Sequence, residues 1–169
     1  YPFDGNASDM SGNGNDGNIT SASLTSDRLG VAYQALKFDG QDDWITIPTS
    51  SSFDSLSSYS ITVWAKIPDF TLNFNPLVSL KSGNDSGFEI YGGNGFTVVH
   101  NRNHTSYQYH YFDAYPSNQW THVAVTYKED GALQRFVDGR LDSSVLNFTS
   151  PNSLAADIQI GRSSYNPEA

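Results

Sequence analysis

The sequence predicts an all-β protein, a two-sheet antiparallel jelly-roll sandwich in a single domain over residues 1–169. About ten short segments rich in β-branched and aromatic residues are separated by Gly, Asn, Asp, Ser and Pro. No stretch of ten or more residues has the 3.6-residue apolar period of a helix. The chain has neither an internal repeat nor a linker, and its length suits one core.

The N-terminal part predicts loops before the first long strand. Residues 5–30 are dominated by Gly, Asn, Asp and Ser, which predicts an ordered loop with one short strand at 18–20. Strands at 35–38 and 44–47 flank Asp39-Gly40, a dipeptide that favours a hairpin turn between them.

The clearest predicted strand lies in the middle of the chain. Residues 52–56 fit one helical turn, and residues 59–67 then alternate strictly between apolar and other side chains. Ile61, Val63, Ala65 and Ile67 are expected on one face, and Thr62, Trp64 and Lys66 on the other.

The remaining strands follow at short intervals, separated by turn residues. A second hairpin turn is expected at Asp138-Gly139. The expected strands are 75–81, 87–91, 95–100, 107–112, 120–127, 134–137 and 158–160. Together they give the strand number of a two-sheet sandwich.

The composition excludes several classes of function. A formal net charge of −9 argues against nucleic acid, because binding to phosphates needs a basic surface. No apolar run approaches the ~20 residues that span a bilayer, so no membrane insertion is expected. Without cysteine there is no disulfide or thiolate metal site. Fifteen of the eighteen acids are Asp, which suits turns and also supplies oxygen ligands for calcium.

Four segments and their order identify a family resemblance. They are Phe38-Asp39-Gly40-Gln41-Asp42-Asp43-Trp44-Ile45-Thr46-Ile47-Pro48, Tyr59 to Ile67, Trp120-Thr121-His122-Val123-Ala124-Val125-Thr126-Tyr127, and Arg135-Phe136-Val137-Asp138-Gly139-Arg140. With the turn-rich start, they resemble the laminin-G-like domains of the concanavalin A-like lectin/glucanase superfamily, from Tyr1 to about Arg162. The resemblance implies the same jelly-roll sandwich and a binding module rather than a catalyst. The family's usual last strand is absent after Ile160, so the final family strand is expected to be missing.

The resemblance also implies one structural calcium ion. Asp9-Met10-Ser11-Gly12-Asn13-Gly14-Asn15-Asp16-Gly17 is similar to the family's entry loop, which often holds this ion, and it lacks the terminal Glu of an EF-hand. The matching ligand positions are Asp9, Asn13, Asn15 and Gly17. The alternative is that Asx-turns hold the loop without a metal.

The sequence contains few of the motifs that catalysis on this fold requires. The glucanases of this fold use Glu-x-Asp-x-x-Glu on one strand, and the chain lacks that string; Glu89 has no acid two or four residues later. The polysaccharide lyases of this fold use a cluster of Arg, Gln, His and Tyr residues. The only resemblance to this cluster is in composition, at His100, Arg102, Tyr107 and Tyr109. There is no Gly-x-Ser-x-Gly elbow. The chain is therefore expected not to be an enzyme.

The aromatic residues suggest a ligand surface. On a strand, Tyr107, Tyr109 and Tyr111 share one face, opposite Gln108, His110 and Phe112. Flat rings stack on the apolar faces of sugars, and charged or amide groups bind the hydroxyls. The expected ligand-binding residues are Tyr91, His100, Arg102, Tyr107, Tyr109 and Tyr111. The alternative is a Tyr-rich sheet cover without a ligand, and Trp44, Trp64 and Trp120 are expected to be packed.

The sequence thus predicts a non-catalytic extracellular recognition module. It is expected to bind a carbohydrate or glycoprotein, or to serve adhesion, as part of a larger secreted or surface protein. Tyr1 begins neither a basic nor an apolar leader segment, so the chain reads as a domain taken from a longer protein. The alternatives are a polysaccharide-active enzyme on the same fold, and a structural or protein-docking region of an adhesin.

Overall fold

The computed structural model describes residues 1–53, 56–67, 75–81, 87–92, 96–103, 106–112, 117–148 and 156–162. For 75, 81, 96–103, 106, 107, 109 and 112, only the backbone is described. These residues form strands and turns, and no helix among them is long and apolar enough to cross a membrane. The predicted all-β class with antiparallel sheets is confirmed.

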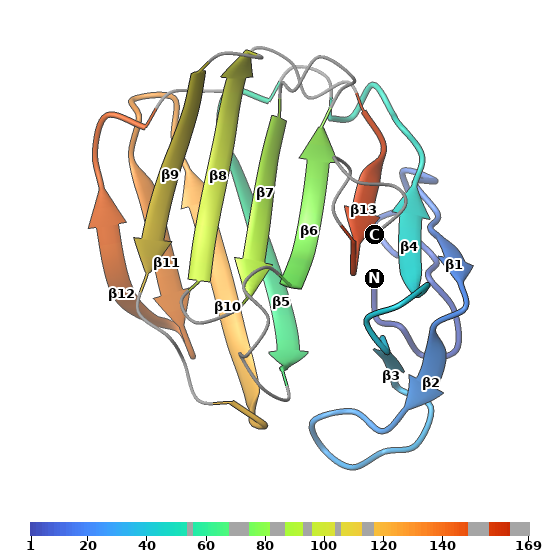
Figure 1. The fold of residues 1–169 in the computed structure, drawn as a ribbon. Helices are drawn as coiled ribbons and strands as arrows, with labels where there is room; N and C mark the ends of the chain where they lie inside the picture. The colour runs from blue at the N-terminus through green and yellow to red at the C-terminus, as the bar shows by residue number, and fades with distance from the viewer. Residues whose placement is uncertain are drawn as a thin grey trace.

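The strands form two stacked sheets and a small ribbon (Figure 1). One sheet has the order β1-β4-β13-β6-β7-β8-β9, the other β12-β11-β10-β5, and β2 pairs with β3 beside them. The strands of the first sheet are β1 (Asn18–Thr20), β4 (Trp44–Ile47), β6 (Asn75–Lys81), β7 (Gly87–Gly92), β8 (Phe96–Asn103), β9 (Ser106–Phe112) and β13 (Ile158–Ile160). The others are β2 (Ser23–Thr25), β3 (Ala35–Lys37), β5 (Tyr59–Lys66), β10 (Trp120–Tyr127), β11 (Leu133–Val137) and β12 (Arg140–Val145).

The core lies between the two sheets. Every second residue of a strand points to the same side, and the inward positions are apolar on both sheets. The buried cluster contains Ile67, Val78, Leu80, Phe88, Ile90, Val123, Val125, Tyr127, Leu133 and Phe148. Tyr59 stacks on Phe88 with ring centroids 5.0 Å apart, which joins β5 to β7 across the sandwich.

The alternation expected in β5 is confirmed, but the expected packing of Trp64 is wrong. Ile61, Val63 and Ala65 pack against the core. Trp64 points the other way and remains 46% exposed on the outer face of the four-stranded sheet. The alternation of side chains along β5 directs Trp64 to this outer face, and the large apolar ring does not override the alternation.

Of the two expected hairpins, one forms and one does not. Asp138 and Gly139 both have positive φ angles, 48° and 78°, and join β11 to β12 as a tight turn. The residues around Asp39-Gly40 instead separate two pairings, because β3 pairs with β2 whereas β4 pairs with β1 and β13. Asp43 Oδ2 accepts the Asp39 N–H at 2.7 Å and closes this connection as a loop. The part of the expected helical turn that is described forms a turn, in which Phe53 N donates to Ser50 O.

An ion pair between a buried arginine and an exposed aspartate lies at the β11–β12 edge of the sandwich. Arg135 is 1% exposed, on the same side of its sheet as Val125, and donates from its guanidinium to Asp142 Oδ2. The register passes from Arg135↔Ser143 to Phe136↔Leu141, so Asp142 is the extra residue of a β-bulge. The bulge lets a carboxylate on an edge strand reach a guanidinium inside the sandwich.

Substitution of Asp142 is expected to destabilise the fold. Asp142→Ala removes the exposed carboxylate that binds a buried guanidinium, which costs about 2 kcal/mol of unfolding free energy. Glu129→Ala, on an exposed turn, is the control and is expected to change the value by less than about 0.5 kcal/mol. Urea unfolding measures both variants. Equal stability of Asp142→Ala and wild type would show that the ion pair does not hold this edge.

Candidate functional site

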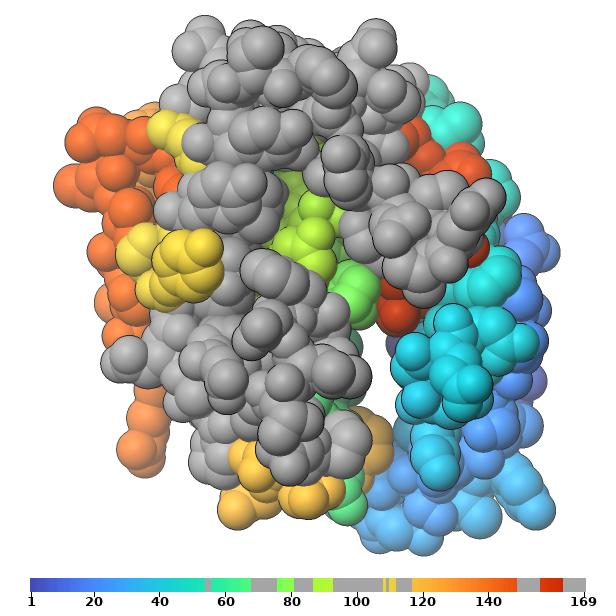
Figure 2. Space-filling view, viewed as in Figure 1, coloured from blue at the N-terminus to red at the C-terminus, as the bar shows by residue number. Residues whose placement is uncertain are grey.

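The outward face of β7 and β9 is the candidate ligand surface. Phe88 and Ile90 of β7 pack in the core, so Glu89 and Tyr91 point away from the four-stranded sheet. Ser79 of β6 pairs with Glu89 and lies on the same face. In the space-filling view, parts of β6 and β7 (green) and of β9 (yellow) are visible on this side (Figure 2). The period of two therefore gives this sheet a polar and aromatic outer side.

Two rows of paired positions cross this face. The first row contains Ser79, Glu89, Val99 and Tyr109. The second contains Tyr91, Thr97 and Tyr111. Because neighbouring strands lie about 4.8 Å apart, the backbone positions of Tyr91 and Tyr111 are separated by about 10 Å, two strands across the sheet.

Glu89 is the buried centre of this surface. Its carboxylate is 2% exposed, accepts a hydrogen bond from Ser79 Oγ at 2.9 Å and another from the Tyr91 hydroxyl at 2.7 Å. A buried carboxylate needs such donors, because loss of water otherwise penalises the charge. The pair of bonds fixes the Tyr91 ring on the sheet.

Tyr111 is the described aromatic residue that projects from this face. Its side chain is 67% exposed, as predicted for the row opposite Gln108 and His110, both of which are half-buried. Tyr91 is half-buried. Of the other predicted ligand residues only the backbone is described, at His100, Arg102, Tyr107 and Tyr109. The backbone of His100 pairs with Phe88 and Gln108, a different register row from that of Tyr109.

His110 faces the interior of the sandwich. Burial, and after it the positive charge of Arg135 on the opposing sheet, hold the pKa of His110 below its ordinary value. The imidazole is therefore neutral at pH 7. The two sides of β9 thus differ in chemistry, with Tyr111 towards solvent and His110 towards a buried cation.

The polar row of Ser79 and Glu89 also contains Gln159 and Thr46, which the sequence did not indicate. Thr46 Oγ1 donates to Gln159 Oε1 at 2.9 Å, and Gln159 pairs with Ser79. These residues are separated by 113 positions in the chain, so no local pattern could have indicated the contact. The polar row therefore continues from β7 across β6 and β13 to β4.

Glu89 has no carboxylate beside it at the paired positions. Its partners in the register are Ser79 on β6 and Val99 on β8. Glycoside hydrolysis needs two carboxyl groups across one cleft, ~5–10 Å apart. The arrangement around Glu89 is one that orients a tyrosine.

The predicted calcium loop is held by hydrogen bonds of its own. Asp9 Oδ1 accepts the Ser11 N–H at 2.8 Å, and Asp9 Oδ2 accepts the Asn15 N–H at 2.9 Å. Asp16 Oδ1 in turn accepts the Asp9 N–H at 2.7 Å. Hydrogen bonding from the Ser11 side chain, and from the N–H groups of Asn15 and Ser11, lowers the pKa of Asp9. Asp9 acts here as an Asx-turn residue.

The three other predicted ligands of this loop also have structural roles. Asn13 donates from Nδ2 to Ser11 Oγ at 2.9 Å, and the Asn15 carbonyl accepts from the Tyr1 hydroxyl at 2.5 Å. Gly17 lies so close to the Ile45 side chain that an added Cβ would be 2.9 Å from its Cγ2. The glycine is thus explained by close packing on β4.

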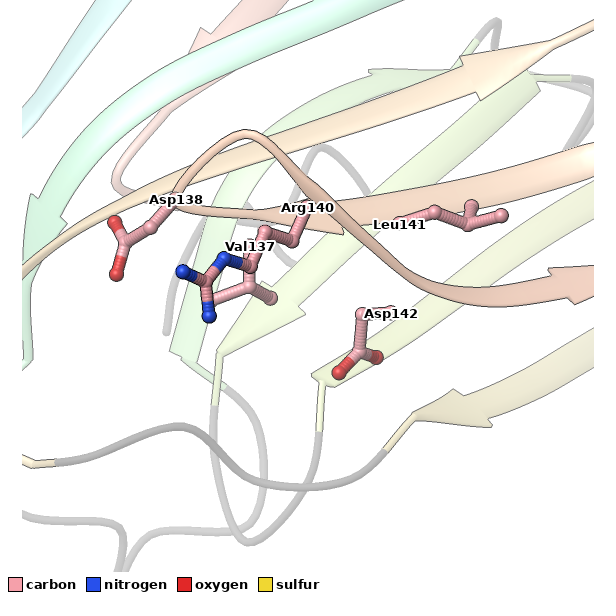
Figure 3. Close-up of a pocket in the computed structure, with 5 residues that line it drawn as sticks. All are labelled: Val137, Asp138, Arg140, Leu141 and Asp142. Carbon is pink, nitrogen blue, oxygen red and sulfur yellow. The ribbon is translucent and has the colours of Figure 1, made fainter.

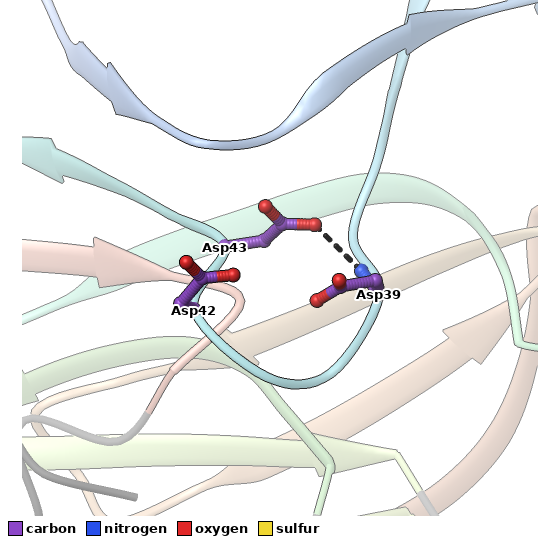
Figure 4. Close-up of side chains that lie close together, drawn as sticks. All are labelled: Asp39, Asp42 and Asp43. Atoms are coloured by element: carbon purple, nitrogen blue, oxygen red, sulfur yellow. Dashed lines mark hydrogen bonds between the residues drawn. The ribbon is translucent and has the colours of Figure 1, made fainter.

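A second acidic group lies between β3 and β4. Carboxylate oxygens of Asp39, Asp42 and Asp43 are within 4.8 Å of one another, and this cluster can hold a metal ion (Figure 4). Asp39 and Asp42 are exposed and Asp43 is half-buried. In the sequence, this turn indicated a hairpin and a family resemblance but not a metal site.

A surface hollow of about 490 Å³ lies at the β11–β12 hairpin. It is lined by Val137, Asp138, Arg140, Leu141 and Asp142 (Figure 3). Its two acids offset the charge of Arg140, and Asp142 already binds Arg135. The hollow therefore offers no excess charge for an ionic ligand.

A family model identifies the family of this chain. A laminin-G family model described as the concanavalin A-like lectin/glucanases superfamily matches residues 39–169, more than three quarters of the chain. A search of the curated proteins found no match.

Solved structures with the same fold include toxin and enzyme-associated domains. The binding domain of Paraclostridial Mosquitocidal Protein 1 is 15% identical, with a TM-score of 0.74 over 90% of this chain and 41% of that chain. The ligand-binding domain of botulinum neurotoxin serotype D, in complex with N-acetylneuraminic acid, is 18% identical, with a TM-score of 0.74 over 91% and 39%. Domain 4 of AbnA, a GH43 extracellular arabinanase from Geobacillus stearothermophilus, in complex with arabinotriose, is 22% identical, with a TM-score of 0.70 over 96% and 82%. This chain thus spans about two fifths of the toxin chains, and at these identities the likeness concerns the fold.

The hydrogen bonds of Asp9 predict a pH-dependent contribution to stability. Because the folded-state pKa of Asp9 is lowered, its contribution is complete above the ordinary value of 3.8 and is lost as the pH falls through the folded-state value. The melting temperature of wild type is therefore expected to exceed that of Asp9→Asn at pH 7, and the difference should shrink below pH 3.8. Asp4→Asn, at an exposed position, is the control. A difference that stays constant down to pH 2 would contradict this role of the Asp9 charge.

Proposed function

Because this chain belongs to the laminin-G branch of the concanavalin A-like lectin/glucanase superfamily, we propose that it is a non-catalytic carbohydrate-binding module. The observation that carries the proposal is that the exposed Tyr111 lies in one register row with Tyr91, which Glu89 fixes, two strands apart on the outer face of β7–β9. We further propose that the module acts outside the cell, as part of a larger secreted or surface protein that recognises glycans or glycoproteins.

The chemistry of this face suits a sugar. Aromatic rings bind the apolar C–H side of a sugar ring, and hydroxyl and amide groups bind its edge. The separation of about 10 Å between the Tyr91 and Tyr111 positions is comparable with the length of a disaccharide. Because hydrogen bonds already fix Tyr91, little conformational entropy is lost there when a ligand binds.

The related structures support a sugar ligand. One domain of this fold is in complex with arabinotriose, and another with N-acetylneuraminic acid. A net charge of −9 makes neutral sugars better candidates than acidic ones, because the charge repels an anionic ligand. We therefore propose a neutral oligosaccharide, bound through Tyr91, Tyr107, Tyr109 and Tyr111, with Arg102 as a hydrogen-bond donor. His100 is left out of this proposed set, because it shares a register row with the core residue Phe88.

We also propose one structural calcium ion, and two places offer it oxygen ligands. The first is the loop of Asp9, Asn13, Asn15 and Gly17 that the family resemblance implies. The second is the turn of Asp39, Asp42 and Asp43. Hard cations of this kind prefer carboxylate and carbonyl oxygens. Backbone N–H groups bind carboxylates in both places: two bind Asp9, and one each binds Asp39 and Asp43.

Tyr111→Ala tests the glycan surface. A glycan array identifies a ligand, and titration calorimetry then measures its Kd, expected between micromolar and millimolar. Loss of the ring is expected to weaken binding about tenfold, while the melting temperature changes little because the side chain is 67% exposed. Tyr33→Ala is the matched control, since Tyr33 is equally exposed on a distant loop.

Two results would contradict the glycan proposal. One is equal affinity of wild type and Tyr111→Ala for every glycan that binds. The other is turnover on a polysaccharide panel that Glu89→Gln abolishes, which would make the chain an enzyme. Tyr109→Ala tests the neighbouring position: a loss of about 3–5 kcal/mol of stability would assign Tyr109 to packing rather than to the ligand.

Chelation tests calcium. At a free concentration of a hundred times Kd, a bound ion stabilises the native state by about 2.7 kcal/mol, so EDTA is expected to lower the melting temperature. The effect should disappear in Asp9→Ala if the ion occupies the first loop, and in Asp42→Asn if it occupies the acidic turn. A melting temperature that EDTA leaves unchanged in wild type would exclude a stabilising calcium ion.

A further inference from the structure

The connection between β2 and β3, residues 26–34, projects from one end of the molecule. In Figure 1 it forms the pale blue loop that extends beyond the lower ends of the strands. It belongs to neither of the two large sheets, because β2 and β3 pair only with each other. Its conformation therefore depends on contacts other than a sheet ladder.

Asp27 holds the loop in one conformation. Its Oδ1 accepts the N–H groups of Leu29 at 2.9 Å and Val31 at 2.8 Å. Its own N–H donates to the Val31 carbonyl at 3.0 Å, and its carbonyl accepts the Gly30 N–H at 3.1 Å. These four bonds satisfy the backbone of the tip without help from the rest of the protein.

Arg28 fixes the loop to the four-stranded sheet. Its guanidinium lies 4.8 Å from the centre of the Trp64 ring, and His122 packs against the same indole with ring centroids 5.2 Å apart. Such a contact of a cation with an indole is favourable even at an exposed site. Trp64 thus serves to hold the loop.

This rigid loop exposes three large side chains. Leu29 is 74% exposed, Val31 52% and Tyr33 67%. Tyr33 has a φ of 62°, a left-handed conformation that bulky residues rarely adopt. Three exposed apolar side chains within five residues of one ordered loop give this end of the molecule an apolar tip.

We propose that residues 29–33 dock into the headgroup layer of a phosphatidylcholine bilayer. The tip is convex, and its three side chains cover far less than the ~800 Å² that each partner buries in a stable protein complex. A lipid surface accepts a small convex apolar group without a complementary pocket. Tyr33 is a residue type that favours the membrane interface, because its ring is apolar and its hydroxyl group polar.

This mode of docking differs from membrane insertion of a strand or helix. The absence of a spanning segment excludes neither a loop nor a side chain from the headgroup layer. Because the whole chain carries a net charge of −9, anionic lipid is not expected to strengthen docking. The affinity is expected to be weak and reversible, on the order of 10⁴ M⁻¹ or below.

Vesicle flotation tests the proposal. Wild type is expected to float with phosphatidylcholine vesicles, and equally in 1 M salt, because apolar contacts drive the docking. The double variant Leu29→Ser/Val31→Ser is expected to reduce the bound fraction at least about tenfold. The double variant Met10→Ser/Leu141→Ser is the control, because its two positions are 75% and 56% exposed elsewhere on the molecule. Asp27→Ala, which releases the loop, is expected to weaken docking while the tip side chains remain.

Four outcomes would overturn the proposal. The first is failure of wild type to float, and the second is flotation of the loop variant equal to that of wild type. Equal loss in the control variant would indicate unspecific adhesion. Sedimentation velocity provides the fourth: a dimer that Leu29→Ser/Val31→Ser dissociates would make the tip an interface between two copies of the chain.

Discussion

The packing of two sheets on one apolar core determines the position of every other functional group in this protein. Because side chains alternate along a strand, burial of Phe88 and Ile90 sends Glu89 and Tyr91 outward. The same constraint on β5 sends Trp64 to the outer face of the other sheet. Both candidate surfaces, the tyrosine face and the face on which the 26–34 loop rests, therefore follow from a single core.

The two surfaces use buried or stacked polar groups for positioning. On the seven-stranded sheet, the buried Glu89 binds the Tyr91 hydroxyl and Ser79, and the row continues through Thr46 and Gln159. On the four-stranded sheet, the guanidinium of Arg28 from the 26–34 loop packs on the Trp64 ring. In each case a side chain that could itself contact a ligand instead orients its neighbour, which reduces the entropy lost when a ligand binds.

Charged groups inside the sandwich are held by irregular backbone. Arg135 is buried between the sheets, and a bulge in β12 brings Asp142 to it. The nearby cation, together with burial, keeps His110 neutral on the inner side of β9. This edge of the molecule is therefore structural, whereas the outer side of the same strand presents Tyr111 to solvent. β9 thus has a packing role on its inner side, and its outer side belongs to the surface that we propose for ligand binding.

The sequence by itself determined most of the strands and their two-residue period, because these depend on neighbours within a few residues of one another, and its motifs identified the family. It did not predict β2 and β12 as strands. It was sufficient to place Tyr111 outside and Ile61, Val63 and Ala65 inside. Tertiary structure alone decided which strands pair, and so the expected hairpin at Asp39-Gly40 did not form although the one at Asp138-Gly139 did. It also decided the contact between Thr46 and Gln159 and that between Arg28 and Trp64, which join distant parts of the chain. Local propensity carries no information about partners so far apart, because only the closed sandwich brings them within reach.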